Sequence, residues 1–181
     1  MDMYKIVKKY RKTYRKILAK GNYPDPDMKQ EAYEKRLAEM YASKRYAEHN
    51  IYPTTNSEYI YAIIAMCLEL KEFGLSDKET IDTVNSGFSS RRNFFKRVRN
   101  GSIFYDQFDV SDGKIEYNIS KCMYVEMFET YGIRPLCKIF CMTDTTAYSN
   151  LEKHVEFIRY SDLSDGDCCH DIIMDKRKIK S

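Results

Sequence analysis

The spacing of apolar residues changes near residue 101, and this change limits the fold of the chain more than any other feature of its sequence. In the first segment apolar residues recur at steps of three and four, which is typical of an amphipathic helix, as at Met3, Val7, Tyr10, Tyr14 and Ile17. From residue 102 the segments SIFYDQFDV and KIEYNIS carry aromatic and β-branched residues in alternation with polar ones, and the Asp112-Gly113 pair between them is typical of a hairpin turn. A helical part followed by strands mixed with helices predicts an α+β domain.

Five helices are predicted in the first hundred residues, at 3–18, about 27–49, 57–73, 77–87 and 89–100. Ser57 is the expected N-cap of the third helix, and Gly74 follows its end, where a left-handed residue is favoured. Ser76 and Glu79 have the spacing of a capping box at the start of the fourth helix.

In the C-terminal part we predict two more helices, at 121–132 and 134–149. Two strands, VEFIRY and DCCHDIIMD, are predicted to follow, separated by a turn at 164–166. We therefore expect N-terminal helices packed with a small antiparallel sheet and two further helices in the C-terminal half. Because the chain has no internal repeat and no low-complexity linker, residues 1–181 are predicted to form a single domain, mainly helical over 1–100 and α+β over 101–176.

Charge and composition argue against several classes of protein. The net charge of +3 is too small to indicate a nucleic-acid-binding protein, although eight basic residues lie among the first twenty. Lysines and arginines leave no apolar stretch for a signal peptide, and the longest apolar run, YIYAIIAMCL, has about half the length that spans a bilayer. We expect a soluble, cytoplasmic protein with no membrane span, whose six cysteines are thiols.

Four candidate ligands or nucleophiles lie together in GDCCHD, residues 166–171. Alternate side chains of a strand share a face, so Cys169 is expected to point with Asp171, and Cys168 with His170. This strand therefore cannot offer all four side chains to one metal ion, and Cys137-x3-Cys141 is the only partial match to a zinc motif elsewhere. We predict no metal and no cofactor.

Two other segments carry candidate chemistry. In the helix predicted over 134–149, Cys137, Cys141 and Asp144 are spaced to lie near one face, either as packing or as a thiol and a carboxylate presented to one pocket. Cys122 begins a helix directly after a lysine, and both a helix N-terminus and a cation lower the pKa of a thiol. From these residues alone, the nucleophile and the small buried apolar residue are equal interpretations of Cys122.

An ordered set of short elements runs from residue 117 to 174: Cys122 with Tyr124 and Glu126, Gly132, Cys141-Met142-Thr143-Asp144, Phe157-Ile158-Arg159, Leu163, and Gly166 followed by Cys169. In this order and at about this spacing they resemble the L-2-amino-thiazoline-4-carboxylic acid hydrolase family. The chain departs from the family at Met123, where a proline is usual, and at His170, which separates Cys169 from Asp171. The first hundred residues resemble the family only as a helical region.

The resemblance implies a hydrolase that opens a cyclic isothiourea, 2-amino-thiazoline-4-carboxylate, or a similar small substrate at a C–N bond to give a carbamoyl-cysteine. It implies that Arg159 makes a bidentate contact with the substrate carboxylate and that Asp144 holds the amidine-like nitrogens and relays protons. The alternative for Asp144 is a structural role, as a cap or as the ion-pair partner of Arg159. The attack on C2 is assigned to Cys122 or Cys169. Tyr124, Cys141 and Asp171 are assigned to substrate binding beside Arg159.

Two other functions remain open. A non-catalytic small-molecule sensor is the alternative, because helices over a small sheet with a cysteine-lined pocket look similar to the vinyl-reductase-type ligand-binding domains. A third interpretation is an interaction module whose basic N-terminal helix lies on an acidic partner or a membrane surface. We rank the hydrolase first, so the expected partner is a small-molecule substrate and not nucleic acid, while homo-oligomerisation stays open.

Overall fold

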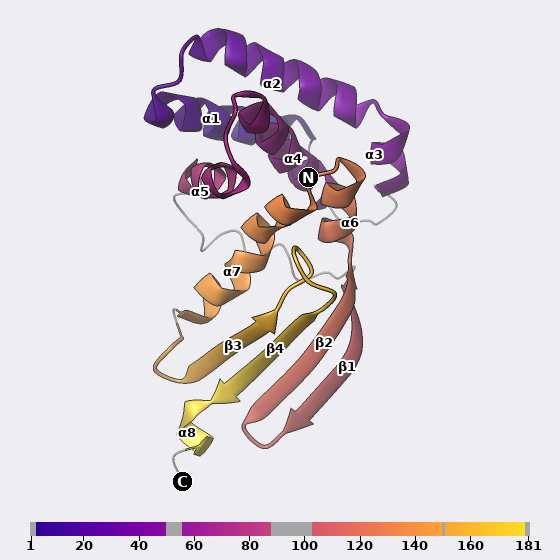
Figure 1. The fold of residues 1–181 in the computed structure, drawn as a ribbon, viewed down its shortest axis with the longest axis vertical. Coiled ribbons are helices and arrows are strands. Elements are labelled where there is room, and N and C mark those ends of the chain that lie inside the picture. Colours follow the sequence, from indigo (N-terminus) through magenta and orange to yellow (C-terminus); the bar gives the residue numbers. More distant parts are fainter. Residues whose placement is uncertain (1–2, 50–55, 88–102, 150, 180–181) are drawn as a thin grey trace. The chain divides into compact units, whose positions relative to one another are not determined.

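The computed structural model describes residues 3–49, 56–87, 103–149 and 151–179 (Figure 1). The chain divides into two compact units, residues 1–89, which we call the helical unit, and residues 90–181, which we call the sheet unit. The helix predicted over 89–100 lies outside the described residues. Within the described ranges, no helix has both the length and the apolar character needed to cross a membrane.

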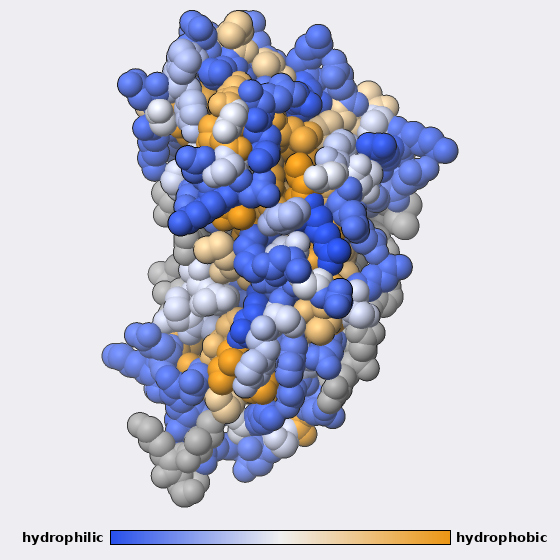
Figure 2. Space-filling view, viewed as in Figure 1, coloured by the Kyte–Doolittle hydropathy of each residue, from blue (hydrophilic) through white to orange (hydrophobic). Residues whose placement is uncertain are grey.

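The helical unit contains α1 (Met3–Gly21), α2 (Pro26–Tyr41), α3 (Lys44–His49), α4 (Asn56–Glu72) and α5 (Asp77–Gly87). Helix α4 is its centre, because it contacts the other four helices and is buried on all sides from Tyr59 to Cys67. The surface that Figure 2 shows is largely hydrophilic over the outer helices of this unit.

The helix boundaries follow local hydrogen bonds. The capping box is confirmed, because the Ser76 backbone N–H donates to the Glu79 carboxylate at 2.8 Å and the Glu79 N–H donates to the Ser76 hydroxyl at 3.3 Å. The prediction of Ser57 as an N-cap is wrong, since α4 already includes Asn56 and the Ser57 hydroxyl donates to the carbonyl of His49 at 3.1 Å.

The helix predicted over about 27–49 is divided into α2 and α3. The break has a local cause at Ser43, whose hydroxyl donates to the carbonyl of Met40 at 2.6 Å and accepts the N–H of Tyr46 at 3.1 Å. The same side chain therefore closes one helix and begins the next.

The sheet unit contains β1 (Ile103–Ser111), β2 (Lys114–Cys122), α6 (Met123–Thr130), a 3-10 turn η2 (Arg134–Cys137), α7 (Lys138–Ser149), β3 (Val155–Ser161), β4 (Cys169–Asp175) and α8 (Lys176–Ile179). The four strands form an antiparallel sheet in the order β1-β2-β4-β3, so β4 lies between β2 and β3. Helix α6 continues from the end of β2, and α7 runs beside β3 (Figure 1).

These elements confirm the predicted α+β class and the hairpin, in which Gly113 has the positive φ of 79° that its turn requires. Three elements differ from the prediction in their boundaries. The helix expected at 121–132 spans Met123–Thr130, and Cys122, which was expected to begin it, is the last residue of β2. The first four residues of the helix expected at 134–149 form the 3-10 turn, and the last strand begins at Cys169 because residues 162–168 form the loop before it.

Candidate functional site

A row of three polar residues crosses the middle of the sheet on its β2, β4 and β3 strands. Asp171 of β4 is the cross-strand partner both of Tyr117 in β2 and of Arg159 in β3. Partners in an antiparallel register lie side by side on the same face. The strand pairing therefore fixes a phenol, a carboxylate and a guanidinium in one line.

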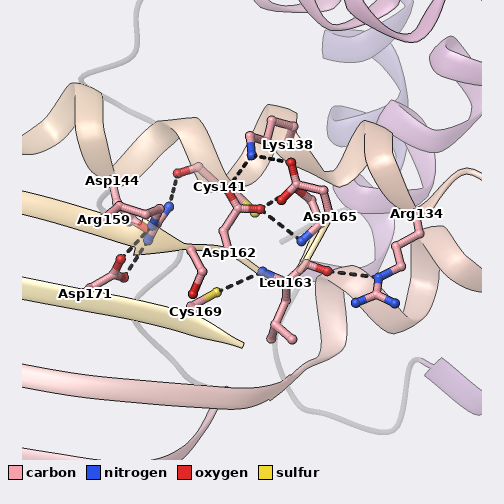
Figure 3. Close-up of polar contacts among 12 residues, drawn as sticks. Arg134, Lys138, Cys141, Asp144, Arg159, Asp162, Leu163, Asp165, Cys169 and Asp171 are labelled. Carbon is pink, nitrogen blue, oxygen red and sulfur yellow. Dashed lines mark hydrogen bonds and ion pairs between the residues drawn. The ribbon is translucent and has the colours of Figure 1, made fainter. Parts of the chain in front are cut away.

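Arg159 is the centre of this group (Figure 3). Its Nε and Nη2 donate to the two carboxylate oxygens of Asp171, at 2.7 and 2.6 Å, in a bidentate pair. Nη2 also donates to Asp144 at 3.0 Å, and Nη1 donates to the backbone carbonyl of Cys141. These four hydrogen bonds use most of the five N–H groups of the guanidinium and connect β3 to both β4 and α7.

The two carboxylates around Arg159 have different environments. The Asp171 side chain is fully buried, whereas the Asp144 side chain is 46% exposed. Partial burial raises the pKa of Asp144, and the opposing effect of Arg159 does not cancel that rise. Asp144 is therefore the carboxylate of this pair that can meet a ligand and exchange protons with it.

Tyr117 is the half-buried residue at the β2 end of the row. Burial raises the pKa of its phenol, as do the negative charges of Asp171 and Asp144 and a hydrogen bond with Asp171. The phenol therefore stays protonated and helps to stabilise the Asp171 carboxylate.

Four of the six cysteines lie around this group, on the β2 end, η2, α7 and β4. Cys141 interacts electrostatically with Cys122, Cys137 and Cys169, and Cys169 also interacts with Arg159 and Asp171. Cys137 and Cys169 are buried, while Cys122 and Cys141 are half-buried. We call Cys122, Cys137, Cys141 and Cys169 the thiol cluster.

Burial governs the chemistry of most of the thiol cluster. It raises the pKa of Cys122 to about 11, although the backbone N–H groups of Val125 and Tyr124 act in the opposite direction. It also raises the pKa of Cys169 to about 12, against the effect of the Leu163 N–H, which donates to its sulfur at 3.4 Å. Of the two interpretations left open for Cys122, the raised pKa favours the small buried residue, because desolvation outweighs the backbone N–H groups at the start of α6.

The loop from 162 to 168 is fixed by basic residues that precede and begin α7. Asp162 is buried, and its carboxylate forms an ion pair with Lys138 Nζ at 2.7 Å. The same carboxylate accepts a hydrogen bond from the backbone N–H of Ser164 at 3.0 Å. Arg134 donates to the carbonyls of Leu163 and Gly166, at 2.9 and 2.7 Å. Since Leu163 in turn contacts Cys169, these bonds hold the start of β4 against α7 (Figure 3).

Alternate side chains of β4 point to opposite faces of the sheet, as predicted. Cys169 and Asp171 are buried toward Cys141 and Arg159. His170 points the other way, where its Nε2 lies 2.8 Å from Glu116 and its ring lies 4.9 Å from that of Tyr160. The Cys168 sulfur lies 3.7 Å from the Ser161 hydroxyl, just before the strand.

The structure thus brings together Cys122, Cys141, Cys169, Asp144, Arg159 and Asp171. Tyr124 reaches this group through its backbone, while its ring is buried and stacked on Phe140 at 5.1 Å between centroids. Within the described ranges, no group of three His, Cys, Asp or Glu side chains has the arrangement of a metal site.

Sequence reasoning missed three contributors to the site. Tyr117 carries no signal beyond its place in a predicted strand. Lys138 and Asp162 are far apart in sequence, although the Asp162-x-Ser164 spacing is typical of a side chain that accepts a backbone N–H two residues on.

Comparison with protein families gives one match. The model of the family described as L-2-amino-thiazoline-4-carboxylic acid hydrolase matches residues 30–172, which include both the Arg159 group and the thiol cluster. Comparisons with curated proteins and with solved structures give no match.

Proposed function

The chain belongs to the L-2-amino-thiazoline-4-carboxylic acid hydrolase family, and from this membership we propose that it hydrolyses a C–N bond of a small cyclic isothiourea or a similar amidine. The thiazoline that gives the family its name is the first substrate to test. Its ring opening adds one water molecule and yields a carbamoyl-cysteine.

The observation that carries this proposal is the charge around Arg159. Two carboxylates, Asp144 and Asp171, share one guanidinium, so the group has an excess of one negative charge when all three are ionised. An amidinium is a planar cation whose two N–H groups match a carboxylate, and the partly exposed Asp144 offers that carboxylate.

Asp144 also supports proton transfer in the proposed reaction. Its raised pKa makes it a better proton acceptor than an ordinary aspartate, and a general acid or base contributes roughly 10²–10⁴-fold to a rate. Arg159 holds Asp144 in place and keeps one Nη1 hydrogen for the substrate carboxylate, so its contact with that carboxylate is a single hydrogen bond in this proposal.

The test is the turnover of the thiazoline by the purified full-length chain, followed by mass spectrometry of the product. We expect formation of a carbamoyl-cysteine, and Asp144→Asn should lower kcat/KM about 10²-fold or more. Asp165→Asn is a matched control, because Asp165 is an exposed carboxylate of the sheet unit that pairs only with Lys138 among the described residues. Full activity of Asp144→Asn would exclude this role for Asp144, and absence of turnover by the wild-type chain would exclude the substrate.

A non-catalytic sensor is the second candidate. The observation in its favour is that three thiols are protonated at neutral pH. Burial raises the pKa of Cys122 and Cys169, and a hydrogen bond with Cys141 together with burial raises that of Cys137. A rise in Tm with the thiazoline, but no product, would favour the sensor over the hydrolase.

A further inference from the structure

Arg159 has little capacity left to bind a substrate carboxylate. Four of its five N–H groups donate within the protein, to Asp171, to Asp144 and to the backbone carbonyl of Cys141. One N–H remains, on Nη1, so a ligand carboxylate could form a bidentate pair only by displacing one of these partners. The Arg159 side chain is also only 14% exposed, which leaves a ligand little surface to approach.

The charge around Arg159 opposes the approach of a further carboxylate. Asp144 and Asp171 lie 3.0 and 2.6 Å from the same Nη2 atom, and together they exceed the charge of the guanidinium by one negative unit when all three groups are ionised. A third carboxylate would meet this excess, and like charges repel more strongly near a protein surface than in bulk water. The group therefore favours a ligand with a net positive charge.

The basic residues that precede and begin α7 are engaged elsewhere. Lys138 pairs with Asp162 and Asp165, at 2.7 and 3.1 Å. Arg134 donates to two backbone carbonyls of the loop before β4. Neither side chain is thus placed as a second cation for a ligand carboxylate at Arg159.

Aromatic rings lie near the partly exposed carboxylate of Asp144. Tyr148 follows Asp144 by one turn of α7, and its ring is stacked on that of Phe157 in β3, with 4.7 Å between centroids and 10° between planes. The phenol of Tyr117 interacts electrostatically with Asp171, Asp144 and Tyr148, so these groups share one neighbourhood. Aromatic faces attract cations, and a flat cation can lie against them.

From this geometry we propose that the chain takes a planar cyclic isothiourea or amidine that carries no carboxylate, such as 2-amino-2-thiazoline, in preference to 2-amino-thiazoline-4-carboxylate. The amidinium pairs with Asp144, whose side chain is 46% exposed. This inference rests on the proposed function for the reaction, but the preference between the two rings is a property of binding and can be measured without turnover.

Hydrolysis of the carboxylate-free ring balances with one water molecule. The water oxygen bonds to C2, and the bond between C2 and the ring nitrogen breaks. Both protons of the water pass to that nitrogen, which leaves as a primary amine. The product is S-carbamoyl-cysteamine, and the reaction needs neither an oxidant nor a second substrate.

The experiment compares the two rings on the wild-type full-length chain. Where neither ring is hydrolysed, isothermal titration calorimetry gives the Kd of each. Where either is hydrolysed, mass spectrometry of an equimolar mixture shows which ring is consumed first. We expect 2-amino-2-thiazoline to be favoured about tenfold at low ionic strength, because the excess negative charge attracts a net cation and repels the added carboxylate. The preference should shrink in high salt.

Two variants and one further ligand separate recognition of an amidinium from a general effect of charge. Calorimetry of Asp144→Asn should show binding of 2-amino-2-thiazoline weakened about tenfold or more and no preference between the rings. Asp165→Asn should keep both, since Asp165 is an exposed carboxylate that pairs with Lys138. Tetramethylammonium has the positive charge but no N–H group, so it should bind about tenfold or more weakly than 2-amino-2-thiazoline.

Three results would overturn the inference. They are equal treatment of the two rings or a preference for the carboxylate, a preference that survives in Asp144→Asn, and binding of tetramethylammonium as tight as that of 2-amino-2-thiazoline. If neither ring is hydrolysed but the preference and its dependence on Asp144 are found, the reaction is wrong while the ligand class stands. If the mixture loses the carboxylate ring first and yields a carbamoyl-cysteine, the function stands while the ligand class is wrong.

Discussion

Arg159 joins two carboxylates that make different contributions to the molecule. The Asp171 side chain has no exposed surface, whereas nearly half of the Asp144 side chain is exposed. Removing one partner of a buried ion pair leaves the other charge uncompensated, but an exposed partner is replaced by water. The same guanidinium therefore stabilises the fold through Asp171 and organises the site through Asp144.

A pair of isosteric variants tests this division. Asp171→Asn should lower the free energy of unfolding by about 3 kcal/mol, because Arg159 loses its bidentate partner in the protein interior. Asp144→Asn should cost less, about 1 kcal/mol, because water can reach the half-exposed Asp144 side chain. Urea unfolding followed by circular dichroism at the same pH measures both values, and equal losses would contradict the division.

The sequence predicted which side chains of β4 share a face of the sheet, but not which residues of other elements those side chains contact. A period of two is enough to place Cys169 with Asp171 and to separate both from His170. The pairing of Asp171 with Arg159 depends on the cross-strand register, which the loop between the two strands sets. The sequence left two interpretations of Cys122 open, because desolvation of its thiol depends on packing that no single segment reveals.

Among the elements, the loop between β3 and β4 has the most consequences for the site. Asp162 is buried within it, and although burial raises the pKa of this carboxyl, the hydrogen bonds from Lys138 and Ser164 together hold it below the usual value. The Asp162 carboxylate therefore contributes stability that is present above its ordinary pKa of 3.8 and is lost as the pH falls through the lower folded-state pKa.

The corresponding prediction concerns Asp162→Asn. At neutral pH this change should cost roughly 1–3 kcal/mol of unfolding free energy, since a charged hydrogen bond to Lys138 is lost. As the pH falls from about 5 toward 2, the difference between wild type and variant should shrink, because the wild-type carboxylate becomes protonated. Chemical unfolding at a series of pH values measures this difference.

Asp165→Asn provides the control for this loop. Asp165 meets the same lysine at 3.1 Å from an exposed position, so its replacement should have a small effect at every pH. A constant difference between wild type and Asp162→Asn across the acid range would show that Asp162 does not act through its charge.

Elements defined by a few adjacent residues could be predicted from the sequence, whereas several helix ends could not. The hairpin and the capping box are encoded by two to four adjacent residues, and both are confirmed. The break at Ser43 and the 3-10 turn before α7 interrupt segments whose apolar spacing continues, so periodicity alone predicts one helix in each case. The ends of elements therefore need side-chain hydrogen bonds that a pattern of apolar residues does not contain.

At the scale of the whole molecule, the two compact units raise the question of how the chain unfolds. Each unit has buried residues of its own, such as Tyr14, Tyr33 and Ile63 in the helical unit and Phe128 and Leu136 in the sheet unit. The family match at 30–172 crosses the boundary at residue 89, so one family model covers parts of both units. The prediction of a single domain over 1–181 therefore calls for a direct test.

The absence of tryptophan from the sequence makes this test simple, because one introduced tryptophan reports on one unit. Phe73→Trp places a probe beside Tyr23 in the helical unit, and Tyr148→Trp places one against Phe157 in the sheet unit. We expect the two fluorescence transitions in urea to coincide with each other and with the loss of circular dichroism. A unit of about ninety residues buries a smaller fraction of its unfolded surface than the whole chain does, so each unit alone should be only marginally stable. Two separated midpoints, each seen by one probe and each matching part of the circular dichroism change, would show instead that the chain consists of two domains that unfold independently.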